Sequence, residues 1–169
     1  MGDFDDLQGI LKTNNKTVAI VNSKGEVVNP TYPKTSPEHI LVQGTLSSGA
    51  VASIAYRKPV SAVDSIGIRW LITGTKGEIE VTTKETQWQM ADPSMKLRVK
   101  LGEGETREVD YKEDDADARF SSLDVVALNT ARSYAAFAKG DETRYATFES
   151  ALKTHRLLDR IAKSAGWTQ

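Results

Sequence analysis

Acid–base chemistry is the first possibility that the residue types raise. Tyr56 and Lys58 end one expected strand, and Asp64 and Arg69 lie in the loop and strand that follow, so several polar groups fall near one end of a sheet. A lysine serves as an acid or a base when burial lowers its pKa. Tyr56, Lys58 and Arg69 are therefore candidate catalytic residues, and the alternative is a solvated sheet edge.

The acidic run Asp3, Asp5 and Asp6 near the N-terminus supplies a second group of candidates. Carboxylates gathered in a pocket act as general bases. The same residues suit the first turn of a helix, where the helix dipole favours negative charge. We keep Asp3 and Asp6 as candidate catalytic residues beside that structural interpretation.

Motifs for cofactors and metals do not occur in the sequence. Neither Gly-x-Gly-x-x-Gly nor a Walker-type phosphate loop is found, so no cofactor is predicted. His39 and His155 are far apart, and His155 falls on the apolar stripe of an expected helix, as a core or interface residue. The acidic run Glu113–Asp117 lacks the spacing and glycine of a calcium loop, so it is predicted to be solvated. No metal site is expected.

Composition narrows the class of protein. The 169 residues suit one domain, and the sequence predicts a single domain over residues 1–169. The 22 Lys and Arg nearly balance the 23 Asp and Glu, so no global field favours nucleic acid or an anionic membrane. No apolar run approaches the roughly 20 residues that span a bilayer, and the acidic N-terminus lacks the pattern of a secretory signal. The absence of cysteine excludes thiolate chemistry. Because neither a membrane span nor a secretory signal is recognised, we expect a cytoplasmic protein.

Strand patterns fill the first two thirds of the chain. Ile66–Val81 predicts a hairpin, because two alternating runs flank the glycines of Thr73–Gly77. His39–Leu46 and Ala50–Arg57 predict a second hairpin. The other expected strands are Thr17–Val21, Thr86–Met90, Lys96–Leu101 and Arg107–Tyr111, and the expected connections are an extended one over Asn29–Pro37 and an acidic one over Lys112–Arg119.

Helical spacing appears at both ends of the chain. Phe4, Leu7, Ile10 and Leu11 predict a two-turn helix over Asp3–Leu11. Two longer helices are predicted near the C-terminus, one capped by Ser121 or Ser122 and ended by Gly140, the other capped by Thr147 and closed by Gly166.

The last of these helices has a broad apolar stripe. Its expected packing residues are Phe148, Ala151, Leu152, His155, Leu158 and Ala162, widened by Leu157, Ile161 and Ala165. Because strands come first and helices last, the sequence predicts an α+β fold, a mostly antiparallel open sheet with helices packed on one face.

Three segments together resemble a known family. Ile40–Tyr56, Trp70–Val81 and Thr147–Ala165, in this order and spacing, look like the C-terminal domain of the Gfo/Idh/MocA oxidoreductase family, and within it the fungal Gal80-like branch. The likeness extends over nearly the whole chain. Members of that family begin with a Rossmann domain that holds NAD(P) and carry a Glu-Lys-Pro motif with the catalytic lysine. This sequence contains neither.

The family's second motif, Gly-x-His followed by an Asp, aligns with Gly2–Asp6. We match its histidine to Asp3 and its aspartate to Asp6, with Leu11 at the following leucine. The resemblance therefore implies that this chain alone does not transfer hydride from NAD(P). It is expected to be either a piece of an oxidoreductase or a stand-alone descendant that kept the sheet.

Three functions remain open, and the sequence does not decide whether the chain is an enzyme. The first is a non-catalytic module that binds a small molecule or assembles with other chains. The second is a cofactor-independent isomerase, cyclase or lyase that reuses the old substrate pocket through the candidate residues. The third is one part of a split oxidoreductase that works with a separate Rossmann-domain partner.

A homodimer is the assembly that the resemblance favours, since in that family the open sheet carries the oligomer contacts. We expect the interface on a sheet face that includes Leu41, Leu71 and Arg69. An interface of this kind buries about 800 Å² per partner or more.

Overall fold

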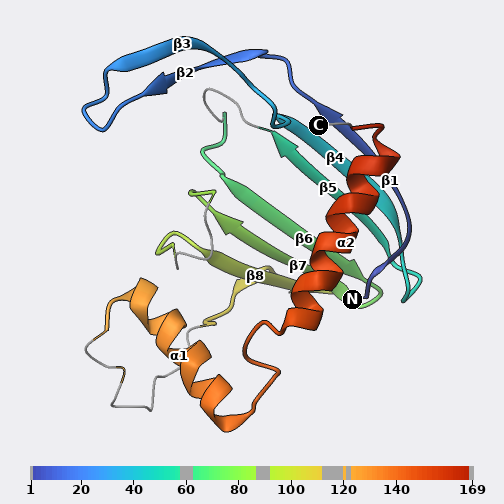
Figure 1. The fold of residues 1–169 in the computed structure, drawn as a ribbon. Coiled ribbons are helices and arrows are strands. Elements are labelled where there is room, and N and C mark those ends of the chain that lie inside the picture. The colour runs from blue at the N-terminus through green and yellow to red at the C-terminus, as the bar shows by residue number, and fades with distance from the viewer. Residues whose placement is uncertain (1, 58–62, 87–91, 112–119, 121–122, 168–169) are drawn as a thin grey trace. The chain divides into compact units, whose positions relative to one another are not determined.

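A computed structural model describes residues 2–57, 63–86, 92–111, 120 and 123–167 (Figure 1). The chain divides into two compact units. The first unit is Met1–Pro59 with Thr147–Gln169, and the second unit is Val60–Ala146. The first unit contains β1 (Phe4–Lys12), β2 (Thr17–Val21), β3 (Val27–Pro33), β4 (His39–Leu46), β5 (Val51–Arg57) and α2 (Phe148–Ser164). The second unit contains β6 (Ile68–Gly74), β7 (Gly77–Thr83), β8 (Lys96–Leu101), β9 (Arg107–Glu108) and α1 (Val125–Lys139).

Every strand pair among the described residues is antiparallel, so the predicted α+β class is confirmed. The strands form a three-stranded sheet in the order β1-β4-β5, the two-stranded hairpin β2-β3, and a four-stranded sheet in the order β6-β7-β8-β9. None of the helices in these described ranges is long and apolar enough to cross a membrane.

The core of the first unit lies between the β1-β4-β5 sheet and α2. Phe4, Val42 and Leu46 are buried on one face of the sheet, and Leu157 and Ile161 of α2 pack against them. Figure 1 shows α2 lying along β1. We call this side of the sheet the helix face and the opposite side the outer face.

The first segment of the chain corrects the sequence prediction, because Asp3–Leu11 is not a helix. Residues Phe4–Lys12 form β1, which pairs with β4 from Phe4 opposite Leu46 to Lys12 opposite His39. A register shift between Phe4 and Asp6 marks a bulge, which turns Phe4 to the helix face together with Leu7. The bulge reproduces a helix-like spacing of apolar residues within a strand.

The segment after β1 is also more regular than expected. Val27–Pro33, predicted largely as an extended connection, forms β3 and pairs with β2. The turn between them has Gly25 at φ 82°, and the backbone N–H of Asn22 donates to Glu26 O. All seven residues of β3 are exposed.

The second unit contains the predicted Ile66–Val81 hairpin as β6 and β7. Trp70 lies opposite Val81 and Leu71 opposite Glu80, so the two faces alternate as expected. β8 follows the prediction, and the strand expected over Arg107–Tyr111 is shorter, only Arg107–Glu108. The strand expected over Thr86–Met90 lies almost entirely outside the described residues, and the acidic loop Lys112–Arg119 lies wholly outside them.

The two helices begin and end at defined caps. Thr147 caps α2 as predicted, accepting a hydrogen bond from Ser150 N at 3.1 Å, and Gly140 ends α1 at φ 69°. The N-cap of α1 is Asp124, which accepts from Ala127 N at 2.8 Å, so the serine cap predicted at Ser121 or Ser122 is wrong.

The orientation of α2 differs from the prediction. Leu157 and Ile161, expected only to widen the stripe, are the residues that pack on the sheet. Phe148, Leu152 and Leu158 are exposed, as is His155, which is therefore not a core residue of the chain by itself. We call these four exposed residues the outer stripe of α2.

Candidate functional site

The outer face of the β1-β4-β5 sheet has an exposed and uncharged centre. The strand registers place Ile10, Leu41 and Ala55 in one row across the sheet, and Gln8, Gln43 and Ser53 in the next. Ile10 is 58% exposed and Leu41 is 46% exposed. We call these six residues the outer patch.

A shallow hollow lies on the outer patch. Its volume is about 260 Å³, and residues of β1, β4 and β5 line it, including Gln8, Gln43 and Ser53. An apolar floor with a few amide and hydroxyl groups is the usual chemistry of a small-molecule site. The hollow can therefore offer hydrogen bonds to an uncharged polar ligand.

Charged residues flank the outer patch at its two ends. At one end Lys12, His39 and Arg57 lie opposite one another across the three strands. At the other end Asp6 lies opposite Thr45, whose backbone N–H donates to the Asp6 carboxylate at 3.1 Å. The Thr45 hydroxyl also hydrogen-bonds the same carboxylate oxygen. The face is thus basic at one end and acidic at the other.

The other predicted aspartate, Asp3, forms an ion pair with α2. Its carboxylate lies 2.6 Å from Lys153 Nζ, and both side chains are exposed. This hydrogen bond raises the pKa of Lys153. Asp3 therefore helps to connect the beginning of the chain to the helix.

Tyr56 lies on the other side of the sheet from Asp6. It pairs with Ile40, and both belong to the helix face, since residues of a strand alternate between faces. Tyr56 is 46% exposed. The candidates Asp6 and Tyr56 therefore do not share a pocket on this sheet.

Arg69 belongs to the second unit, where it is part of a charge ladder. Its guanidinium lies 3.4 Å from Asp64 and 3.5 Å from Glu80, and Arg98 pairs with the same Glu80. Lys58 lies outside the described residues, as does the acidic run Glu113–Asp117. Among the residues that are described, His, Asp and Glu do not gather in groups of three that could hold a metal ion.

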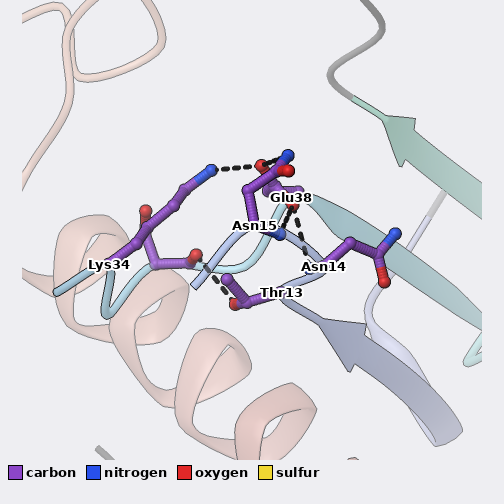
Figure 2. Close-up of polar contacts among 6 residues, drawn as sticks. Thr13, Asn14, Asn15, Lys34 and Glu38 are labelled. Carbon is purple, nitrogen blue, oxygen red and sulfur yellow. Dashed lines mark hydrogen bonds and ion pairs between the residues drawn. The ribbon is translucent and has the colours of Figure 1, made fainter. Parts of the chain in front are cut away.

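Glu38 is a buried carboxylate that sequence analysis missed. One of its oxygens accepts the backbone N–H groups of Asn14 and Asn15, both at 2.9 Å, and the other accepts Asn15 Nδ2 at 2.7 Å and Lys34 Nζ at 2.6 Å (Figure 2). The Lys34 hydrogen bond, followed by those of Asn15, holds the pKa of Glu38 well below its usual range. The Thr13 hydroxyl donates to Ser36 O beside it, at 3.0 Å.

The position of Glu38 explains its role. It stands directly before β4 and holds the turn between β1 and β2, so it fixes the root of the β2-β3 hairpin. With four hydrogen bonds its oxygens are saturated, which fits a structural anchor. The signal in the sequence was weak, because only the tertiary fold brings Asn14 and Asn15 to a residue more than twenty positions away.

The fold defines the chain as similar to the C-terminal domain of a larger protein. Residues 1–83 match the family model described as Gal80p, C-terminal domain. None of the curated proteins matches the chain. The predicted resemblance to a Gfo/Idh/MocA C-terminal domain of the Gal80-like branch is thereby confirmed.

Solved structures extend the similarity of fold to the whole chain. A super-repressor mutant of Gal80p from Saccharomyces cerevisiae matches with a TM-score of 0.71 and 18% identity, covering 97% of this chain and 43% of that one. The transcriptional regulator Gal80p from Kluyveromyces lactis matches with a TM-score of 0.66 and 20% identity, covering 97% of this chain and 39% of that one. This chain therefore spans less than half the length of these relatives.

Proposed function

We propose that the chain is a non-catalytic binding and assembly module. Its outer patch packs against the outer patch of a second copy, and the hollow on that patch holds a small uncharged polar molecule. The observation that carries the proposal is the exposed row Ile10, Leu41 and Ala55 at the centre of a charge-free area. Exposed apolar patches of this kind usually mark an interface or a ligand site.

The charges around the outer patch support self-association. In a two-fold dimer each surface meets a copy of itself. With the axis in the plane of the sheet and across the strands, the basic row Lys12, His39 and Arg57 faces the acidic end at Asp6 of the other copy. The same pairing encloses the hollow, which is open to solvent in one copy. In the second unit, taken by itself, Leu71 of β6 is also exposed and remains a predicted contact residue, with Arg69 two positions before it.

The surroundings of the candidate catalytic residues also favour a non-catalytic function. Asp3 is paired with Lys153, Asp6 with Thr45, and Arg69 with Asp64 and Glu80. Acid–base catalysis needs its groups within reach of one substrate. A cofactor-independent isomerase, cyclase or lyase is therefore the weaker candidate.

A charge placed in the outer patch tests the dimer. Wild-type protein should self-associate at micromolar concentration, and Leu41→Lys should sediment as a smaller species, because two ammonium groups would be buried in the interface through the outer patch. Leu152→Lys, which changes an equally exposed leucine on α2, should sediment as the wild type does. A wild-type monomer, or a Leu41→Lys variant that sediments as the wild type does, would refute the interface.

Native mass spectrometry of the purified chain, before any ligand is added, tests the hollow. We expect a co-purified small molecule that is lost in Gln43→Ala, because the amide of Gln43 lines the hollow. A protein that carries no extra mass, or a mass retained in Gln43→Ala, would argue against this site.

A second function is favoured by the outer stripe of α2. Phe148 is 98% exposed and Leu158 is 56% exposed, which is unusual for a helix that already packs on a sheet. A separate Rossmann-domain partner would cover this stripe if the chain is part of a split NAD(P)-dependent oxidoreductase. A Rossmann domain excised from one of the Gal80p relatives should then bind the wild type and Leu41→Lys, and fail to bind Leu152→Lys. Equal binding of all three would exclude this contact.

A further inference from the structure

Strand edges in the first unit differ in how many backbone hydrogen-bonding groups remain available to another strand. At β1, the backbone N–H of Gly9 donates to Ser164 Oγ at 2.9 Å, and Arg160 donates to the carbonyl oxygens of Phe4 and Asp5 at 2.8 and 3.0 Å. Side chains of α2 therefore occupy the hydrogen-bonding groups that another strand would use. This edge is closed to further pairing.

The free edge of β3 is closed by its own sequence. Pro30 and Pro33 have no backbone N–H, so they cannot donate to a neighbouring strand. The N–H of Thr31 donates to Asn29 Oδ1 at 3.0 Å. A strand approaching β3 therefore finds few available donors.

The free edge of β2 is open. The backbone N–H of Lys34 donates to Lys16 O at 2.9 Å, and that of Asn22 donates to Glu26 O at 2.9 Å. Because these groups alternate along a strand, Val18 and Ile20 direct their N–H and C=O groups to β3, and Thr17, Ala19 and Val21 direct theirs outward. These outward groups are not bonded to any described residue beyond the hairpin.

The hairpin that carries this edge is apolar and fixed at both ends. None of the twelve residues of β2 and β3 is charged, and five of their large side chains are exposed: Ile20, Val21, Val27, Val28 and Tyr32. Glu38 anchors the root, and Asn22 Oδ1 orders the tip by accepting from Lys24 N and Glu26 N. A preorganised strand loses little conformational entropy when it pairs.

We propose that β2 pairs antiparallel with β2 of a second copy, which joins two hairpins into one four-stranded sheet. Ala19 is the middle residue of β2, so a two-fold axis there places Ala19 opposite the partner's Ala19 and Thr17 opposite the partner's Val21. The outward N–H and C=O groups of both strands are then used. Isolated two-stranded hairpins are marginal in water, and additional strands stabilise them.

A second copy fits this edge for a specific reason. When a strand pairs with a copy of itself about a two-fold axis, a charged residue near that axis lies close to the same residue of the partner. Like charges at this distance destabilise the pair. β2 has no charge, its central side chain is a methyl group, and Lys16 falls opposite the partner's Asn22. Two copies therefore pair without repulsion. The contact does not depend on the outer patch, and a chain that uses both would form an assembly larger than a dimer.

The absence of cysteine from the sequence allows a clean cross-linking test. In the proposed pair, the two Ala19 Cα atoms form a hydrogen-bonded pair about 5.5 Å apart, which suits a disulfide. Ala19→Cys should form a disulfide-linked dimer on mild oxidation, and it should do so in the Leu41→Lys background as well. Val21→Cys is the matched control, because its partner across the pair is Thr17 and the two Val21 positions lie roughly 13 Å apart along the strand.

Amide hydrogen exchange measures the same pairing without a cross-link. Amide hydrogen exchange over residues 16–22 should slow by about tenfold at concentrations where nine-tenths of the chains are paired. Ala19→Lys should abolish this protection, and Ala19→Val should keep it. The proposal is overturned if Ala19→Cys links no faster than Val21→Cys, or if exchange does not depend on concentration. A thermal midpoint of Ala19→Lys equal to that of the wild type will show that the fold is intact.

Discussion

The amide of Gly9 donates a hydrogen bond to the hydroxyl of Ser164, at 2.9 Å and across 155 residues of sequence. The absence of a side chain at Gly9 permits this approach, since a Cβ there would lie 3.0 Å from Ile161 O and 3.1 Å from Ser164 Oγ. A backbone group of strand β1 and a side chain of helix α2, from opposite ends of the chain, are thus joined directly.

Ser164→Ala should lower the free energy of unfolding by about 1 kcal/mol, because the Gly9 N–H loses its acceptor at a partly buried site. Thr154→Ala is the matched control. Both hydroxyls donate to a carbonyl of their own helix, and of the two only Ser164 also accepts a bond from β1. Urea unfolding measures both variants. A similar loss in the two variants would show that the contact to Gly9 contributes nothing.

Gly9→Ala should destabilise the first unit by about 1 to 2 kcal/mol, because the new methyl group pushes α2 away from β1. Gly74→Ala serves for comparison, since a Cβ there would meet its nearest atom, Gly77 O, at 3.8 Å and so fits without strain. Thermal unfolding of the two variants measures the difference. Unchanged stability in Gly9→Ala would mean that the helix shifts without cost.

Ile161→Ala should cost about 2 kcal/mol of unfolding free energy, since Ile161 packs on the buried cluster of Phe4, Val42 and Leu46. Leu158→Ala, in the outer stripe, should change stability by less than about 0.5 kcal/mol in the monomer. Denaturant midpoints of the two variants, each made in the Leu41→Lys background so that the outer-patch contact is absent, give a direct comparison. A larger loss of stability in Leu158→Ala than in Ile161→Ala would instead support the packing stripe that the sequence predicted.

Stability should depend on pH through Glu38. Its pKa in the folded chain is lowered from the usual value near 4.5, chiefly by the hydrogen bond from Lys34. The unfolded chain therefore binds a proton first as the pH falls, so the stabilisation by Glu38 is complete above about pH 5 and is lost progressively below pH 4.5. Glu38→Gln should be less stable than the wild type at pH 7, and the difference should shrink at pH 3.

The control for this pH effect is Glu103→Gln, which changes an exposed carboxylate in the turn after β8. The urea midpoints of Glu103→Gln should equal those of the wild type at both pH 7 and pH 3. Those of Glu38→Gln should lie below the wild type at pH 7. A constant gap between wild type and Glu38→Gln at both pH values would show that the charge of Glu38 does not stabilise the fold.

Sequence patterns were sufficient where one element forms from its own residues. The hairpin around Gly74 and Gly77, the cap at Thr147 and the end of α1 at Gly140 depend on neighbouring residues, and all three are present. Patterns failed where a distant partner decides the outcome. Phe4–Lys12 has helical spacing, but its pairing with β4 satisfies the backbone and makes it a strand.

The sequence by itself determined the α+β class, the hairpins β4-β5 and β6-β7, the two helices near the C-terminus, and the resemblance to a Gal80p C-terminal domain. Only the tertiary structure decided which stripe of α2 packs, that Glu38 is buried among four hydrogen bonds, and which strand edges are closed. The physical reason is the range of the interactions. Alternation, turns and caps are local along the chain, whereas the burial of a side chain and the saturation of a backbone group depend on residues that folding brings from far away.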